Sequence, residues 1–139
     1  MTEIAAAAAD AASGSTIRSP FNEHLGIEIV RLGHDEVELH LPIRPEFLNS
    51  IGIVHGGVYA SLADVALATA VYARVGRGTV AITAEMSCRY LRGARAGTLV
   101  SRARVLHTGR STAVSEAEVF VDGELQFKAS GTFMLVPRT

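Results

Sequence analysis

The chain has 139 residues, the length of one domain, and its 13 basic and 14 acidic side chains leave a net charge of −1. A balance so close to neutral offers no field that would attract nucleic acid or an anionic membrane. The single cysteine, Cys88, cannot form an intrachain disulfide, and no Cys/His cluster has the spacing of a zinc site. We therefore expect a protein of a reducing, cytoplasmic setting that holds no metal and needs no cofactor.

Residues 1–18 are interpreted as a flexible tail before a single domain over residues 19–139. An alanine run in this tail resembles the apolar segment of a signal peptide, but Glu3 stands where such a peptide is basic, and Asp10 interrupts the run. We expect a frayed or weakly helical tail rather than a targeting signal.

The domain is predicted to open with a short helix and a hairpin. Ser19 and Pro20 have the pattern of an N-cap and a first helical residue, so a helix is expected over residues 20–25, ended by Gly26. The first strand, turn and second strand of the hairpin are predicted at residues 27–32, 33–35 and 36–42. Apolar and polar side chains alternate along the second strand, as expected for a sheet with one buried face.

The stretch from Asn49 to Val75 is the one around which we expect the rest of the chain to be arranged, as one buried helix. From Val58 to Val75 the only charged residues are Asp64 and Arg74, and small or apolar residues cover every side of a 3.6-residue period. A helix of this kind is buried in protein or spans a membrane, and a carboxylate near its middle argues against the membrane. Asp64 is then a buried ionisable group, which is costly unless paired and often marks function.

Four further strands are predicted after a break at residues 76–78. They are rich in β-branched residues or alternate in polarity, and their ranges are 79–91, 98–107, 113–121 and 124–135. The order is a short helix, two strands, a long buried helix, and then three or four antiparallel strands in a meander. This order predicts an α+β fold.

The last hairpin contains the pair Asp122-Gly123, which favours a two-residue type I′ turn. That register would place Glu118 opposite Phe127 and mix the two faces of the sheet. We expect instead a three-residue loop that begins at Val121, with Gly123 left-handed in a bulge. The expected pairs are Val119 with Leu125 and Ala117 with Phe127.

A series of short motifs runs through most of the predicted domain. In order, they are Asn49, His55-Gly56-Gly57, Leu62-Ala63-Asp64, Thr83-Ala84-Glu85-Met86, Tyr90-Leu91-Arg92, Gly97, His107-Thr108-Gly109-Arg110 and Gly131-Thr132-Phe133. As a spaced set they resemble the hotdog-fold acyl-CoA thioesterases, specifically the phenylacetate-degradation (PaaI) type. The resemblance implies an antiparallel sheet wrapped around the central helix. It also implies a homodimer whose sheets join edge to edge, and dimers that pair into a homotetramer.

The resemblance also implies roles for individual residues. In such enzymes the residue matching Asp64 acts as general base or nucleophile on the thioester carbonyl, and the backbone N–H of the residue matching Gly56 polarises the carbonyl oxygen. The residues matching Asn49, His55 and Thr83 hold the water, the carboxylate or the loop. Threonine stands at Thr83 where the family often has serine, and some relatives carry glutamate in place of Asp64.

The spacing of these groups indicates a site shared between chains. A helix N-terminus has free N–H groups and partial positive charge, so Gly56 can place a donor where an oxyanion develops. Asp64 lies eight residues further on, which is about 12 Å along a helix. One helix cannot bring both groups to one carbonyl, so Asp64 of one chain and residues 55–57 of another are required.

Most of these residues also have a purely structural interpretation. Asp64 could be a buried aspartate satisfied by a neighbouring hydroxyl, and His55 could fix the entry to the helix. Asn49 could be a turn residue bonded locally, and Thr83 could be an ordinary strand residue. Gly57 is interpreted as part of the substrate-binding loop with its neighbour.

Arg110 and Ser111 lie in a turn beside a strand end. A guanidinium and loop N–H groups suit the phosphates of coenzyme A, but the same residues could be a charged hairpin tip.

We therefore expect an acyl-CoA thioesterase that works through a carboxylate-activated water or an acyl-enzyme anhydride. One rival is a hotdog hydratase or dehydratase, which needs an acid/base pair close to the acyl Cα–Cβ bond. The other is a non-catalytic acyl-CoA-binding module, which would have no need of Asp64.

Overall fold

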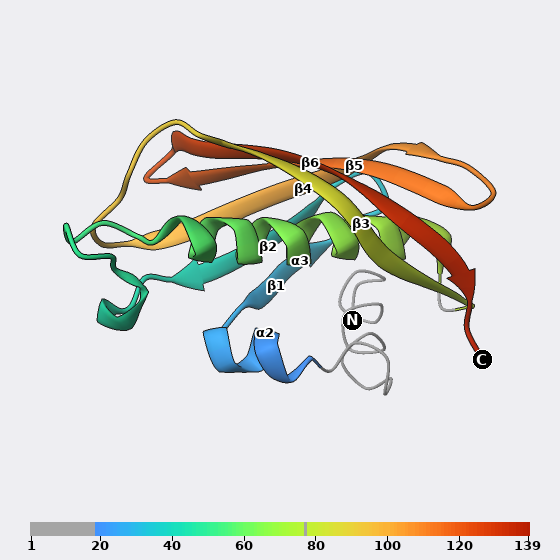
Figure 1. Cartoon of the computed structure of the whole chain (residues 1–139), viewed down its shortest axis with the longest axis horizontal. Coiled ribbons are helices and arrows are strands. Elements are labelled where there is room, and N and C mark those ends of the chain that lie inside the picture. The colour runs from blue at the N-terminus through green and yellow to red at the C-terminus, as the bar shows by residue number, and fades with distance from the viewer. Residues whose placement is uncertain (1–18, 77) are drawn as a thin grey trace.

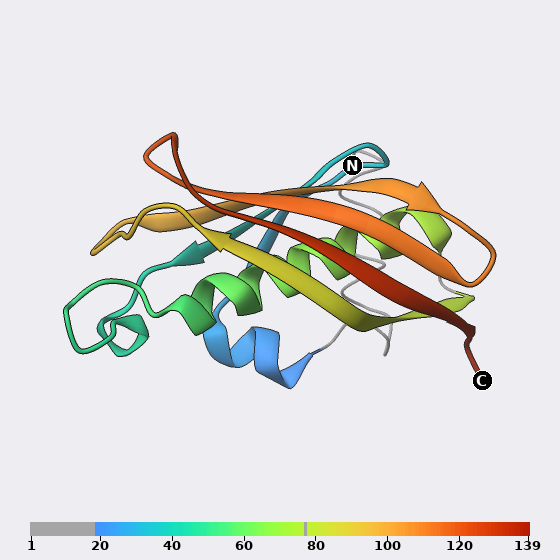
Figure 2. The same ribbon diagram turned by 45° about the horizontal axis from the view of Figure 1, so that its top comes forward.

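A six-stranded antiparallel sheet curves around one long helix in the computed structural model, which describes residues 19–76 and 78–139 (Figures 1 and 2). The helices are α2 (Pro20–Leu25), the 3₁₀ turn η1 (Pro45–Phe47) and α3 (Gly56–Val75). The strands are β1 (Glu28–Leu32), β2 (Val37–Pro42), β3 (Thr79–Tyr90), β4 (Thr98–Thr108), β5 (Thr112–Val121) and β6 (Glu124–Pro137). The predicted α+β fold is confirmed, and the tail predicted over residues 1–18 lies outside the described residues.

The strands lie in the order β1-β2-β4-β5-β6-β3, so the predicted meander holds for β4, β5 and β6 only. β3 pairs with β6 at the edge of the sheet, and residues 91–97 then carry the chain past two strands to β4. The crossing is about 14 Å at the usual strand spacing, which a segment of that length spans easily. β3 is therefore an edge strand of 12 residues, whereas β1 at the other edge has five.

The short helix α2 has the predicted ends. The Ser19 side chain accepts a hydrogen bond from the Asn22 N–H at 3.3 Å, and Pro20 is the first helical residue. Gly26 ends the helix in the left-handed conformation, at φ 85°.

Helix α3 begins at Gly56, so the first part of the stretch predicted as helix from Asn49 is a loop. The Asn49 Oδ1 atom accepts hydrogen bonds from the N–H groups of Ile51 and Ile53, at 3.1 and 3.2 Å. A side chain that satisfies nearby backbone N–H groups in this way competes with the helix. Asn49 therefore has the local turn role that was one of its two interpretations.

One face of α3 is buried under the sheet, rather than every side of the helix. The buried side chains recur every three or four residues and are Tyr59, Leu62, Ala63, Ala66, Leu67, Ala70 and Val71. Val65 and Ala68 are only partly buried, and so is Asp64, which was expected to be buried. The prediction was wrong because the sheet of one chain covers only one side of the helix (Figure 2). By length and composition α3 could cross a membrane, a test that the core helix of a soluble protein also passes.

The loop between β5 and β6 consists of Asp122 and Gly123 alone, so the predicted three-residue loop is wrong. Both residues have positive φ, at 50° and 77°, as a type I′ turn requires. Val121 and Glu124 form the pair that closes this turn. The left-handed conformation predicted for Gly123 is confirmed.

A bulge in β6 makes the two-residue turn compatible with the apolar pattern. Gln126 is an extra residue between the pairs formed by its neighbours, so the register shifts by one position. Beyond the bulge Val119 faces Phe127 and Glu118 faces Lys128. Apolar and charged side chains thus return to their own faces, which is the result that a longer loop was invoked to explain.

We predict that Gly123→Ala lowers the free energy of unfolding by about 1 kcal/mol and the Tm by about 2–4 °C. No other group lies within 4 Å of the position of an added Cβ, so the penalty comes from the backbone conformation alone. Gly123→Asn is the matched control and should lose less, because asparagine tolerates this conformation. Thermal unfolding measures both, and an alanine variant as stable as the wild type would contradict the type I′ turn.

Candidate active site

The first turn of α3 is held by the side chain of the residue before it. His55 is the N-cap, and its Nδ1 atom accepts a hydrogen bond from the Gly57 N–H at 2.9 Å. The His55 N–H in turn donates to the Phe47 carbonyl at 2.8 Å. His55 therefore has the helix-entry role that the sequence left open. Because the Gly57 N–H is engaged by this ring, it is not a free donor.

Tyr90, at the end of β3, covers Gly56. Its hydroxyl donates a hydrogen bond to the Gly56 carbonyl at 3.0 Å, and a Cβ added at Gly56 would lie 3.1 Å from the ring. Glycine thus allows the ring to approach without displacement. Burial, and to a lesser extent electrostatic repulsion from Cys88, raises the pKa of Tyr90, which keeps the hydroxyl protonated as the donor in this bond.

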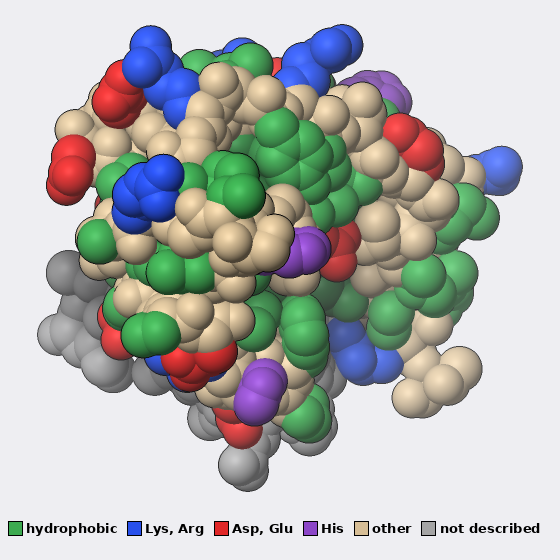
Figure 3. All heavy atoms as spheres, turned by 60° about the vertical axis from the view of Figure 1, so that its left-hand side comes forward, with side chains coloured by type: hydrophobic (Ala, Val, Ile, Leu, Met, Phe, Trp, Pro, Cys, Tyr) green, Lys and Arg blue, Asp and Glu red, His purple; other side chains and the backbone are tan. Residues whose placement is uncertain are grey.

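The Gly56 N–H has no hydrogen-bond partner among residues 19–76 and 78–139. The next peptide unit is fixed at both ends, at its carbonyl by Tyr90 and at its N–H by His55. A free and rigidly held N–H at a helix N-terminus is a suitable donor to an oxyanion. Figure 3 shows the end of the molecule at which α3 begins, where hydrophobic side chains gather on the surface. Ile51 and Leu91, from the segments beside this entry, are among the exposed hydrophobic residues.

Asp64 lies two turns further along α3 and is fixed by β3. The Thr83 hydroxyl donates a hydrogen bond to Asp64 Oδ1 at 2.8 Å. In the described part of the chain no group bonds to Oδ2 of this carboxylate. One oxygen is therefore held in place while the other is free to take a proton or to attack a carbonyl.

Cys88 is the other reactive side chain near this carboxylate. Burial raises the pKa of its thiol, and the negative charges of Asp64 and Glu85 raise it further. Because the thiolate is the nucleophilic form of cysteine, this shift makes Cys88 a poor nucleophile at neutral pH.

Arg110 and Ser111 lie in the hairpin between β4 and β5, beyond the other end of α3. Arg110 lines a cleft of about 340 Å³ together with Val75 and residues 135–137. Val75 is 11 residues from Asp64, or about 16 Å along the helix. The structure thus places this pair apart from the carboxylate.

The predicted site residues form three separate groups in one chain. The first is the helix entry with Asn49, His55, Gly56 and Gly57, the second is Asp64 with Thr83, and the third is Arg110 with Ser111. Tyr90 is a residue whose contact with the site sequence reasoning missed, although it lies within a recognised motif. An aromatic residue at the end of a strand, paired with a glycine at a helix start, was the signal that could have found it.

Comparison with known proteins identifies the family. The sequence model of the thioesterase superfamily matches residues 51–128, more than half of the chain. The chain belongs to the thioesterase superfamily. The proofreading thioesterase EntH of Cronobacter turicensis is 32% identical to this thioesterase over 98 residues, which cover 70% of this chain and 72% of EntH.

Solved structures agree with this assignment. The conserved protein PA5202 from Pseudomonas aeruginosa is 34% identical with a TM-score of 0.85, and the match covers 89% of this chain and 99% of that one. A mutant of the phenylacetic acid degradation protein PaaI from Thermus thermophilus is 31% identical with a TM-score of 0.77, covering 84% and 98%. The chain is a hotdog-fold thioesterase of the PaaI type, an enzyme that hydrolyses thioesters.

We predict that Thr83→Val lowers kcat/KM by about tenfold or more, because a hydrogen bond to a charged group is typically worth about 1.5–3 kcal/mol. Thr83→Ser keeps the hydroxyl and should retain most of the activity. Release of free thiol from a thioester substrate measures both variants. A valine variant as active as the serine variant would show that the contact with Asp64 is structural.

Proposed function

We propose that this thioesterase hydrolyses acyl-CoA, with Asp64 as base or nucleophile and the Gly56 N–H as the donor to the thioester carbonyl. The observation that carries the proposal is that one oxygen of the Asp64 carboxylate is hydrogen-bonded while the other is free, and that the free Gly56 N–H lies at a rigidly held helix start. Acyl transfer needs these two elements: a group that generates or provides the nucleophile, and a donor aimed at the developing oxyanion.

Two routes use the same residues. In the first, the free oxygen of Asp64 takes a proton from water, and the hydroxide attacks the carbonyl carbon. The tetrahedral oxyanion is stabilised by the Gly56 N–H, then collapses and expels the thiolate, which recovers the proton. In the second, Asp64 itself attacks the carbonyl carbon, and the C–S bond breaks as the thiolate leaves, which forms a mixed anhydride. Water then hydrolyses the anhydride to the free acid and the Asp64 carboxylate, and the proton released goes to the thiolate.

The two groups must come from different subunits. They are eight residues apart on one straight helix, or about 12 Å, whereas an oxyanion donor lies about 3 Å from its acceptor. A homodimer with two shared sites is therefore the smallest functional unit, and pairing of dimers into a tetramer remains the expectation from the family resemblance. We place this assembly in the cytoplasm.

Coenzyme A fits the third group of residues. The cleft lined by Arg110 offers a guanidinium, and the neighbouring Ser111 a hydroxyl, to the phosphates of the nucleotide. The separation of about 16 Å from Asp64 is one that an extended pantetheine arm can cover. Arg110 is thus assigned to the distal end of the substrate, not to the reaction itself.

We predict that Asp64→Asn lowers turnover by at least about 100-fold while the dimer stays folded, because the amide is nearly isosteric but is neither base nor nucleophile. A panel of short, long and aromatic acyl-CoA substrates, with free thiol as the readout, tests the activity and its acyl preference together. A variant that kept more than about a tenth of wild-type turnover would remove Asp64 from the reaction.

Mixing two inactive variants should restore activity if the site is shared. Gly56→Pro removes the donor N–H, and His55 already has the extended ψ of 138° that a following proline requires. A mixed dimer of Asp64→Asn and Gly56→Pro holds one site with both lesions and one with neither. A statistical mixture should therefore recover about a quarter of the wild-type rate.

Gly56→Ala is the matched control for this experiment. It adds the same Cβ beside the Tyr90 ring but keeps the N–H, so it separates crowding from loss of the donor. If both homodimers are folded and exchange subunits, yet no activity returns on mixing, the shared site must be abandoned.

A further inference from the structure

The exposed outer row of β3 carries two charges that have no partner in the chain. Glu85 and Arg89 are both exposed, and neither forms an ion pair with any other residue within 19–76 and 78–139. Arg89 even lies opposite Lys128, a like charge on β6. These two side chains stand two positions either side of Ser87.

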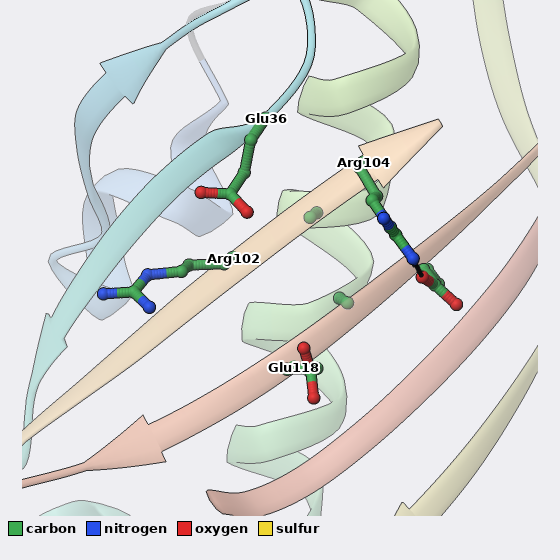
Figure 4. Close-up of a pocket in the computed structure, with 7 residues that line it drawn as sticks. Glu36, Arg102, Arg104 and Glu118 are labelled. Carbon is green, nitrogen blue, oxygen red and sulfur yellow. Dashed lines mark hydrogen bonds and ion pairs between the residues drawn. The ribbon is translucent and has the colours of Figure 1, made fainter. Parts of the chain in front are cut away.

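The inner strands of the sheet behave differently. Every acidic, lysine and arginine side chain of β2, β4, β5 and β6 is in an ion pair, and the pairs are Glu38–Arg102, Arg104–Glu116, Glu118–Lys128 and Glu124–Arg92. Figure 4 shows members of this network standing on the face turned away from α3. Against such a pattern, two unpaired and opposite charges on an edge strand indicate that their partners belong to another molecule.

The register of β3 with β6 defines which residues share a face. Glu85, Ser87 and Arg89 lie opposite Thr132, Ser130 and Lys128, in the outer row. Met86, Cys88 and Tyr90 lie opposite Gly131, Ala129 and Phe127, which are buried and face α3. Paired residues of antiparallel strands point to the same face, so a second β3 must match outer residues with outer residues.

Few self-pairings of β3 remain under this rule. A two-fold axis at Glu85 or at Arg89 would place that charge opposite its own copy, which is unfavourable. An axis at Met86 or at Cys88 would leave both charges unpaired. An axis at Ser87 places Glu85 opposite Arg89 of the partner subunit, and it does so twice.

A second, independent observation selects the same axis. An extra residue, Ala84, shifts the register of β3 between Thr83 and Glu85. With the axis at Ser87, the inward-facing Thr83 therefore comes opposite Tyr90 of the partner subunit. Thr83 holds Asp64 and Tyr90 holds Gly56, so this register brings the carboxylate of one chain to the donor of the other.

The family resemblance already implies a dimer whose sheets join edge to edge, and β3 is the long free edge of this sheet. Within that dimer we infer a two-fold axis at Ser87, so that Glu85 of each chain forms an ion pair with Arg89 of the partner subunit. The inference rests on the shared site of the proposed function and adds the register that assembles it. Met86 of each chain then lies opposite the partner subunit's Cys88, and these side chains line the seam between the two Asp64 carboxylates.

Single-cysteine cross-linking locates the axis directly. In a Cys88→Ala background, Ser87→Cys places two thiols opposite each other at a pair distance of about 4.5–5.5 Å, which suits a disulfide. Glu85→Cys and Arg89→Cys are the matched controls, because each then faces a residue of different type and lies several residues from its own copy. Under mild oxidation we expect Ser87→Cys to cross-link at least about tenfold faster than either control.

The same experiment can overturn the inference. Faster self-cross-linking of Glu85→Cys or Arg89→Cys than of Ser87→Cys would place the axis at that residue instead. If sedimentation shows a dimer but none of the three variants cross-links, β3 does not form the dimer interface. If inactive variants complement on mixing but Ser87→Cys does not cross-link, the register fails while the shared site stands. Efficient cross-linking at Ser87 without complementation would support the register and remove the shared site.

Charge reversal tests the ion pairs themselves. Glu85→Arg or Arg89→Glu alone makes two like-charge contacts per dimer, and we expect each to raise the dimer dissociation constant by about tenfold at low salt. The double variant exchanges the two charges and should return to within about threefold of the wild type. Asp35→Lys, at an exposed hairpin tip, is the control and should have no effect. A double variant as weak as the single variants would refute the pairing.

Discussion

The fixed rise of α3 governs how the site can be assembled. A straight helix holds its first residue and its ninth about 12 Å apart, and no side-chain movement brings a backbone N–H at Gly56 to a carboxylate at Asp64. β3 runs beside the helix and touches it at both places, through Tyr90 at the start and Thr83 in the middle. A two-fold axis that crosses β3 between these two contacts brings the Thr83 end of one strand beside the Tyr90 end of the other. Each chain can then supply the half of the site that the other lacks.

An exposed edge of 12 residues would be a hazard in a protein that stayed monomeric. Its free N–H and C=O groups can pair with any strand, and only the side chains decide which strand and which register. In the inferred dimer, Glu85 and Arg89 both favour the correct pairing and disfavour incorrect ones. They favour one antiparallel register with a copy of the same strand, and they disfavour registers that place either charge opposite itself. In the dimer that we infer, the same two residues therefore favour the correct register and disfavour aggregation.

The parts of the fold that could be predicted are those that depend on residues close together in the sequence. Ser19 and Pro20 marked the start of α2, and the alternation along β2, β4 and β5 marked strands because one face meets α3 and the other meets water. The place of β3 beside β6 was not predictable, since the order of strands depends on how the whole sheet closes. The bulge at Gln126 was missed for a related reason: one extra residue in a strand shifts the pattern just as a longer loop would.

The candidate site divides in the same way. Motifs pointed to Asp64, Thr83 and the entry to α3. The hydrogen bond from the Thr83 hydroxyl to Asp64 agrees with the role that the resemblance implied for Thr83, and equally with the structural interpretation of Asp64 as a carboxylate satisfied by a neighbouring hydroxyl. What the motifs could not show was how the entry is held. His55 bonds through its ring to a backbone N–H two residues away, and Tyr90 reaches Gly56 from a position 34 residues distant. Contacts of the second kind exist only once the sheet has wrapped around the helix.

The two halves of the proposed site are held with unequal rigidity, and the difference suits the roles proposed for them. Around the helix entry, the rings of Tyr59, Tyr90 and Phe127 form a cluster with centroids 5.0 to 6.4 Å apart, and Tyr59 and Phe127 are buried. This cluster ties the Gly56 peptide to the centre of the sheet. Asp64 is half-buried and held through one hydroxyl. A donor to an oxyanion is effective when it is already in place before charge develops, whereas a base or nucleophile must move a proton or form a bond. In the proposed mechanism, the chain thus fixes the donor at Gly56, which must not move, and leaves one oxygen free on Asp64, which must react.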